Sequence, residues 1–134
     1  MSSEREASAR ALMTSDYLAL PTTATVGKVL AELRCSGKEP HGISYIYVLK
    51  TDGNTLSGVV DLRELVLAAD EKSLAEIMTS PVVSADEDDV QEDLAEIFAK
   101  YHYRMIPVVD PRDRILGVIR YNDIMKGLVT RVKD

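Results

Sequence analysis

The sequence predicts an α/β (α+β) fold in which two β-α-β-β-α motifs pack pseudo-symmetrically through their sheets. Three observations lead to this prediction. The chain of 134 residues is 46% hydrophobic, which is enough to form a core. The second half of the chain repeats the first. In each half, short apolar runs alternate with segments whose apolar residues recur at helical spacing.

The repeat consists of matched segments that recur in the same order. An LMTS or IMTS element comes first, a segment with an Ala-Glu pair follows, and two apolar segments come last. The matched residues are 12–15 with 77–80, 30–33 with 94–97, 47–49 with 107–109, and 58–60 with 117–119. We therefore expect an N-terminal extension at residues 1–10, one motif at 11–73 and the other at 74–134.

Each copy predicts the same elements in the same order. A short apolar stretch comes first, and a helix follows. That helix can be capped by Thr23 or Thr25 in the first copy and by a side chain from residues 84–89 in the second. Two strands joined by a tight turn come next, before a closing helix. The short stretch, first strand, turn, second strand and closing helix cover, in that order, residues 17–20, 43–49, 51–54, 56–60 and 62–69 in the first copy. In the second copy they cover residues 81–83, 105–109, 110–113, 115–119 and 122–129, and in both copies the first helix lies between the stretch and the first strand.

The composition excludes several function classes. The net charge of −6 argues against non-specific nucleic-acid binding, which needs a basic surface. The single cysteine, Cys35, rules out an internal disulfide and a thiolate zinc site, and we expect it to be half-buried late in a helix. His41 and His102 belong to no HExxH or triad motif, and there is no P-loop, so we expect no enzyme activity.

The hydropathy pattern predicts no direct membrane insertion. No apolar run approaches the roughly 18 residues that a membrane span needs. Residues 1–10 lack the apolar region of a signal peptide. We therefore expect a cytoplasmic location, including the cytosolic part of a membrane protein.

Three motifs in this order point to one protein family. They are Met78-Thr79-Ser80-Pro81-Val82-Val83, Ile106-Pro107-Val108-Val109-Asp110, and Gly117-Val118-Ile119-Arg120-Tyr121-Asn122-Asp123-Ile124. Together with their counterparts in the first copy they cover nearly the whole chain, which resembles a tandem pair of CBS domains (a Bateman module). Residues 11–14, 45–48, 58–65 and 75–78 resemble, more particularly, the cytosolic CBS region of MgtE-type magnesium transporters.

The resemblance implies a regulatory function without catalysis. It implies that the module forms a homodimer and binds an adenine nucleotide, with ATP favoured, and/or Mg²⁺. Binding would allosterically gate a membrane-embedded magnesium transporter domain outside this chain. The alternative is a generic CBS module, either alone or attached to an enzyme. Such a module would bind AMP, ADP or S-adenosylmethionine, or act only in dimerisation.

The resemblance also implies two nucleotide-binding clefts, each built from both copies. The base needs an apolar slot, the ribose hydroxyls suit a carboxylate, and the phosphates need cations. The matching residues of the first cleft are Asp61, Arg63, Glu64, Thr79, Val82, Val83, Tyr103, Ile106 and Pro107. Those of the second are Thr14, Leu18, Ala19, Tyr45, Tyr47, Arg120 and Asp123. Because Tyr45 and Tyr47 alternate on a strand, we expect one of them to pack in the core.

Both clefts depart from the family pattern. Asp61 and Arg120 replace the usual Thr or Ser, and Glu64 replaces the ribose-binding Asp, which the second copy keeps as Asp123. Asp61 adds negative charge near the phosphates, a conflict that a metal ion such as the Mg²⁺ of Mg-ATP could bridge. The first cleft is favoured because the MgtE resemblance is strongest there.

The densest acidic run is a candidate Mg²⁺ site. Hard cations prefer carboxylate and water ligands, and the candidate ligands are Asp86, Asp88, Asp89 and Glu92. The structural alternative is a capped helix start with acidic residues in its first turn, which the helix dipole favours. The sequence leaves both interpretations open.

Overall fold

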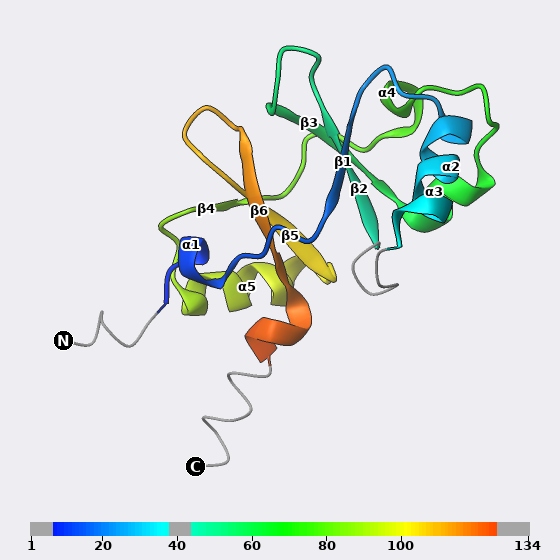
Figure 1. The fold of residues 1–134 in the computed structure, drawn as a ribbon. Helices are drawn as coiled ribbons and strands as arrows, with labels where there is room; N and C mark the ends of the chain where they lie inside the picture. Colours follow the sequence, from blue (N-terminus) through cyan, green and yellow to red (C-terminus); the bar gives the residue numbers. More distant parts are fainter. Residues whose placement is uncertain (1–6, 38–43, 126–134) are drawn as a thin grey trace. The chain divides into compact units, whose positions relative to one another are not determined.

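The computed structural model describes residues 7–37 and 44–125, which form two compact units (Figure 1). Unit 1 consists of the chain up to Ser15 together with the chain from Val83 onward, and unit 2 is Asp16–Val82. Each unit contains one three-stranded sheet with helices packed on it. The predicted fold class, mixed α and β with two small sheets, is therefore confirmed.

Unit 2 contains the sheet β1-β2-β3. Strand β1 (Leu18–Pro21) pairs in parallel with β2 (Tyr45–Leu49), which pairs antiparallel with β3 (Leu56–Asp61). Helices α2 (Val26–Ser36) and α3 (Leu62–Leu67) lie beside each other, and α4 (Leu74–Ile77) contacts β3 (Figure 1). The core is aliphatic: Val26, Val29, Ile46, Val48, Val60, Leu65 and Leu74 are completely buried.

Unit 1 contains the sheet β4-β5-β6. Strand β4 (Ala85–Asp86) pairs in parallel with β5 (Met105–Val109), which pairs antiparallel with β6 (Ile115–Arg120). Helix α1 (Ala9–Leu12) contacts β6, α5 (Gln91–Tyr101) follows β4, and residues 121–125 are helical. The buried core consists of Ala9, Ala85, Leu94, Phe98, Ile106, Val108, Ile119 and Ile124.

The LMTS and IMTS elements have the same structural role in the two units. Backbone hydrogen bonds of 2.8 and 3.0 Å join Thr14 to Val118 on β6, and bonds of 2.9 and 3.0 Å join Thr79 to Val59 on β3. The methionine before each threonine packs against a strand glycine. A Cβ on Gly58 would lie 2.8 Å from Met78 Cγ, closer than atoms normally approach. The recurrent pairing of methionine, threonine and glycine in the sequence is therefore a packing requirement.

The structure corrects the position of one predicted strand, the end of one predicted helix and the burial of Cys35. The short strand of the second copy is β4, because Ala85 pairs with Val108, whereas residues 81–83 are not a strand. The first closing helix was predicted to extend to residue 69 but ends at Leu67. Thr25 caps α2 as predicted, and Cys35 in that helix is exposed, not half-buried. Parts of the predicted segments 43–49 and 122–129 lie outside the described residues.

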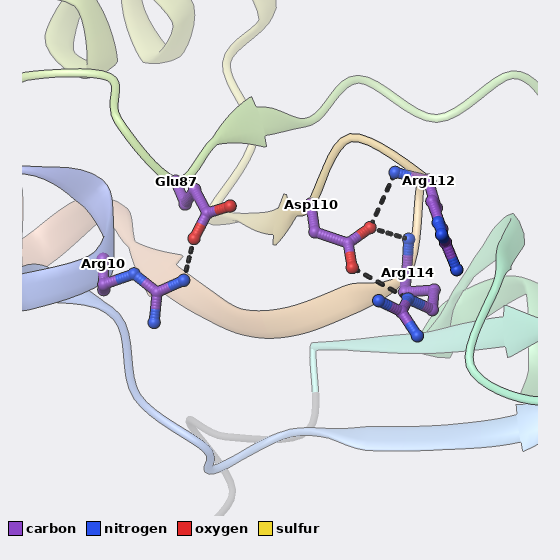
Figure 2. Close-up of polar contacts among 5 residues, drawn as sticks. All are labelled: Arg10, Glu87, Asp110, Arg112 and Arg114. Carbon is purple, nitrogen blue, oxygen red and sulfur yellow. Dashed lines mark hydrogen bonds and ion pairs between the residues drawn. The ribbon is translucent and has the colours of Figure 1, made fainter.

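The turn between β5 and β6 is closed by one carboxylate. Asp110 Oδ1 accepts hydrogen bonds from the backbone N–H groups of Arg112 and Arg114, both at 2.9 Å. Its Oδ2 accepts from Arg114 Nε at 2.8 Å (Figure 2). The hydrogen bonds from Arg114, together with the one from Arg112, hold the pKa of Asp110 below its ordinary value of 3.8.

This lowered pKa predicts an acid-sensitive contribution to stability. A carboxylate whose pKa is lower in the folded than in the unfolded state stabilises the fold above its unfolded pKa. That contribution is lost as the pH falls through the folded pKa. We expect Asp110→Asn to lower the melting temperature near neutral pH. Below about pH 4, the melting temperature of the variant should fall less steeply with decreasing pH than that of the wild type. The measurement is the melting temperature as a function of pH. Asp113→Asn, in the same turn, is the control, and equal pH profiles for the two variants would contradict the prediction.

Candidate functional site

Unit 2 contains a pocket of about 340 Å³ at the junction of β3 and α3. It is lined by Asp61, Arg63, Glu64 and Leu67 and is open to solvent. Asp61 is the last residue of β3 and the N-cap of α3, and the other three lie on the helix. The first three belong to the predicted first cleft, so the structure brings its charged members together.

Asp61 and Glu64 form a capping box. Asp61 Oδ1 accepts from the Arg63 backbone N–H at 2.8 Å, and Glu64 Oε1 accepts from the Asp61 backbone N–H at 2.9 Å. The two carboxylates therefore have a structural role in starting α3. They are also the two positions of the first cleft at which the sequence departs from the pattern that the resemblance implies.

Arg63 interacts directly with Asp61. Its Nε lies 3.4 Å from Asp61 Oδ1 and its Nη2 lies 3.5 Å from Oδ2. The hydrogen bond to Asp61 and the attraction between the two charges raise the pKa of Arg63. The Arg63 side chain is 86% exposed, so the guanidinium can leave Asp61 for a ligand at little cost.

The other predicted members of the first cleft lie in different places. In unit 2, Thr79 is bonded to β3 and Val82 is half-buried. Unit 1 contains Val83, which is half-buried, Tyr103, whose ring stacks on Tyr101 at 6.1 Å, and the buried β5 residues Ile106 and Pro107. Ile106 is part of the core of unit 1. Packing alone accounts for its presence in the motif.

The predicted second cleft also draws on both units. Leu18, Ala19, Tyr45 and Tyr47 lie on the paired strands β1 and β2 of unit 2. Tyr47 is 1% exposed, which confirms that one of the two tyrosines packs in the interior. In unit 1, Arg120 Nε donates to Asp123 Oδ2 at 3.2 Å, and Thr14 is joined to the strand that ends at Arg120.

Sequence reasoning missed two residues in these places. Leu67 lines the pocket, and its position three residues after Glu64 on a helix was a usable signal. Tyr17 packs edge-on against Tyr47, with ring centroids 6.2 Å apart. Burial raises the pKa of the Tyr17 hydroxyl. Tyr17 lay in the predicted apolar stretch, but nothing in its spacing marked it as part of an aromatic pair.

The acidic run has mainly structural contacts. Asp89 Oδ2 accepts from the Asp86 backbone N–H at 3.0 Å, and Glu87 forms an ion pair with Arg10 (Figure 2). Asp88 is exposed, and Glu92 lies in the first turn of α5. Within residues 7–37 and 44–125, no three His, Cys, Asp or Glu side chains are grouped to hold a metal ion. The geometry therefore gives no support to the predicted Mg²⁺ site.

Helix α5 begins without a side-chain cap. Its N-cap is Val90, which makes no side-chain capping hydrogen bond, and the carboxylate of the preceding Asp89 accepts from the Asp86 backbone N–H instead. Glu92 and Asp93 lie in the first turn of α5, where the helix dipole favours acidic side chains, as the helix-start interpretation predicts. The prediction of a cap among residues 84–89 was wrong.

Comparison with known proteins identifies the family. A family model described as CBS domain matches residues 9–71 and 74–130. The magnesium transporter MgtE of Thermus thermophilus is 38% identical over 92% of this chain, which spans 27% of that relative's length. Within the part of the chain that the structure describes, no helix is both long enough and apolar enough to cross a membrane.

Solved structures agree with this result. The cytosolic domain of the Mg²⁺ channel MgtE in complex with ATP has a TM-score of 0.83 at 35% identity, covering 90% of this chain and 48% of that one. The CBS domains of a transcriptional regulator from Streptococcus pneumoniae share the fold, with a TM-score of 0.76 at 20% identity over 89% of this chain and 97% of that one. The resemblance to tandem CBS domains and to the MgtE cytosolic region is thus confirmed.

Proposed function

Because the chain belongs to the CBS domain family and contains two such domains, we propose that it is a regulatory module that binds an adenine nucleotide, with ATP favoured. The observation that carries this proposal is the pocket at Asp61, Arg63, Glu64 and Leu67. It is supported by the 35% identity to a cytosolic MgtE domain whose structure is a complex with ATP.

The pocket offers a suitable group for each part of a nucleotide. Glu64 uses Oε1 for the capping box, and its Oε2 can accept hydrogen bonds from the ribose hydroxyls. The exposed Arg63 guanidinium can form charge-assisted hydrogen bonds with phosphate oxygens. Leu67 is 86% exposed and supplies an apolar surface for the base. The contribution of the predicted cleft residues in unit 1 remains a prediction.

The proposed consequence of binding is allosteric control of a transporter. Three relatives at 30–38% identity are magnesium transporters, and the chain spans about a quarter of the length of each. We propose that the module is cytosolic and homodimeric, does not catalyse a reaction, and gates a membrane-embedded magnesium transporter domain. Binding of nucleotide, with or without Mg²⁺, would shift the equilibrium between two conformational states of the module. The free energy of this shift can be no larger than the difference between the binding free energies of the ligand for the two states.

The test is a thermal-shift titration with ATP, ADP, AMP and S-adenosylmethionine, each with and without Mg²⁺. A ligand at 100 times its Kd stabilises a protein by about 2.7 kcal/mol, a shift of several degrees for a chain of this size. The proposal predicts the largest shift with ATP. A larger shift with another ligand would favour the generic CBS module, and no shift with any of them would contradict nucleotide binding.

The role of Glu64 gives a sharper prediction. Glu64→Gln keeps a side-chain acceptor for the Asp61 N–H, so the capping box is retained, but it removes the charged acceptor for the ribose. We expect ATP affinity to fall about tenfold, the usual value of one charge-assisted hydrogen bond. Titration calorimetry measures this change. Glu76→Gln is the matched control, because Glu76 lies at the same position of the first turn of α4. Equal ATP affinities for the two variants would show that Glu64 does not contact the nucleotide.

A further inference from the structure

The two units have opposite charges at one equivalent position. Asp61 ends β3, and Arg120 ends β6. Each pairs with the first residue of the preceding strand, Tyr45 in one unit and Met105 in the other. In both units the next residue then donates its backbone N–H to the residue just before that strand. One unit therefore presents a carboxylate where the other presents a guanidinium.

The acidic residue three positions later is present in both units but has a different partner. In unit 2, Glu64 accepts from a backbone N–H, and the Asp61 charge faces Arg63. In unit 1, Asp123 accepts from Arg120 Nε at 3.2 Å. The residues at this turn therefore include two carboxylates and one guanidinium in unit 2, but one of each in unit 1. The net charge of this turn is therefore one unit more negative in unit 2 than in unit 1.

We infer that Asp61 and Arg120 give the two units opposite preferences for ligand charge, an inference that rests on the proposed nucleotide binding. The turn of unit 2 favours an uncharged nucleoside, or a nucleotide whose phosphates are neutralised by Mg²⁺. The turn of unit 1 favours the free anionic phosphate. The reason is electrostatic: a guanidinium pairs well with phosphate, whereas a carboxylate near it repels it.

Asp61 allows a clean substitution. Asn is as good an N-cap as Asp, so Asp61→Asn removes the charge while keeping the start of α3. In Mg²⁺-free buffer, the affinity for AMP relative to adenosine is expected to rise about three- to tenfold, the effect of one unit charge at an exposed site. The control is Asp52→Asn, which makes the same charge change on an exposed turn residue of unit 2.

Arg120 provides the opposite test. Arg120→Gln keeps a polar side chain at the end of β6 but removes the positive charge. The affinity for AMP relative to adenosine is expected to fall about three- to tenfold. Arg112→Gln, on an exposed turn residue of unit 1, is the matched control. Its backbone hydrogen bond to Asp110 is unaffected by the substitution.

Titration calorimetry of all four variants with AMP and adenosine decides between the outcomes. Where adenosine binds too weakly to saturate, the AMP affinity is compared with that of the control variant. Opposite shifts for Asp61→Asn and Arg120→Gln, with unchanged controls, support the inference. If the affinity for AMP relative to adenosine shifts in the same direction in both variants, or in neither, the inference is overturned. If it shifts in only one variant, the charge preference assigned to the other unit is overturned. A wild-type chain that binds none of adenosine, AMP and ATP overturns the proposed function itself.

Discussion

Replacing Phe98 by alanine is expected to lower the free energy of unfolding by about 3–5 kcal/mol. The ring is 1% exposed and lies in the core of unit 1, where it meets the ring of Tyr121 edge-on at 5.7 Å. Its removal loses the burial of an aromatic ring and leaves a cavity that the strands can only partly fill. Since domains are stable by only about 5–15 kcal/mol, the loss is a large part of the total.

Chemical denaturation followed by circular dichroism measures this effect. The control is Glu96→Ala, an exposed substitution on the same helix that keeps a strong helix former. Glu96→Ala is expected to change stability by less than about 0.5 kcal/mol. If Phe98→Ala were as mild as the control, the core position of the ring would be wrong.

Replacing Gly58 by alanine is expected to cost about 1–3 kcal/mol, the usual cost of overpacking. The added Cβ would lie 2.8 Å from Cγ and 3.0 Å from Cβ of Met78. Both Cβ atoms are fixed to the backbone, so rotation of the Met78 side chain can move its Cγ away but cannot relieve the contact between the two Cβ atoms. The chain that carries Thr79 would have to move away from β3.

A double-mutant cycle tests this mechanism. In the Met78→Ala background Cγ and Sδ are gone and only the contact with the remaining Cβ is left, so Gly58→Ala is expected to cost less there than in the wild type. The free energies of unfolding of the four proteins give the coupling. Gly117 offers a parallel case, because its Cβ would lie 2.9 Å from Met13 Sδ and 3.0 Å from the backbone oxygen of Thr14. Strictly additive costs at Gly58 and Met78 would show that the strain has another source.

The hairpin strands could be predicted closely from the sequence, whereas the one-turn elements could not. Strands β2, β3, β5 and β6 are apolar runs bounded by turn residues, and their ends were found to within two residues. Helices α1 and α4 have four residues each, which is too short for a helical period to be recognised. Strand β4 has two residues, and only its long-range pairing with β5 defines it.

The candidate site was predictable in its residues but not in their interactions. The family motif indicated Asp61, Arg63 and Glu64, and the pocket contains all three. Their capping box follows from the Asp-x-x-Glu spacing and could also have been predicted. The pairing of Arg63 with Asp61 depends on side-chain conformations that no pattern specifies. The sequence left two interpretations of the acidic run open, because no pattern specifies the hydrogen bond within the turn at Asp89 or the ion pair between Glu87 and Arg10.

Calorimetric titration of the wild-type chain with ATP tests the central claim most directly. Inorganic triphosphate, which has the charge of the phosphates without the nucleoside, is the control ligand. The account predicts saturable binding of ATP and no comparable binding of triphosphate, because Glu64 and Leu67 are proposed to contact the nucleoside. Equal binding of the two ligands, or no binding of ATP with and without Mg²⁺, would contradict it.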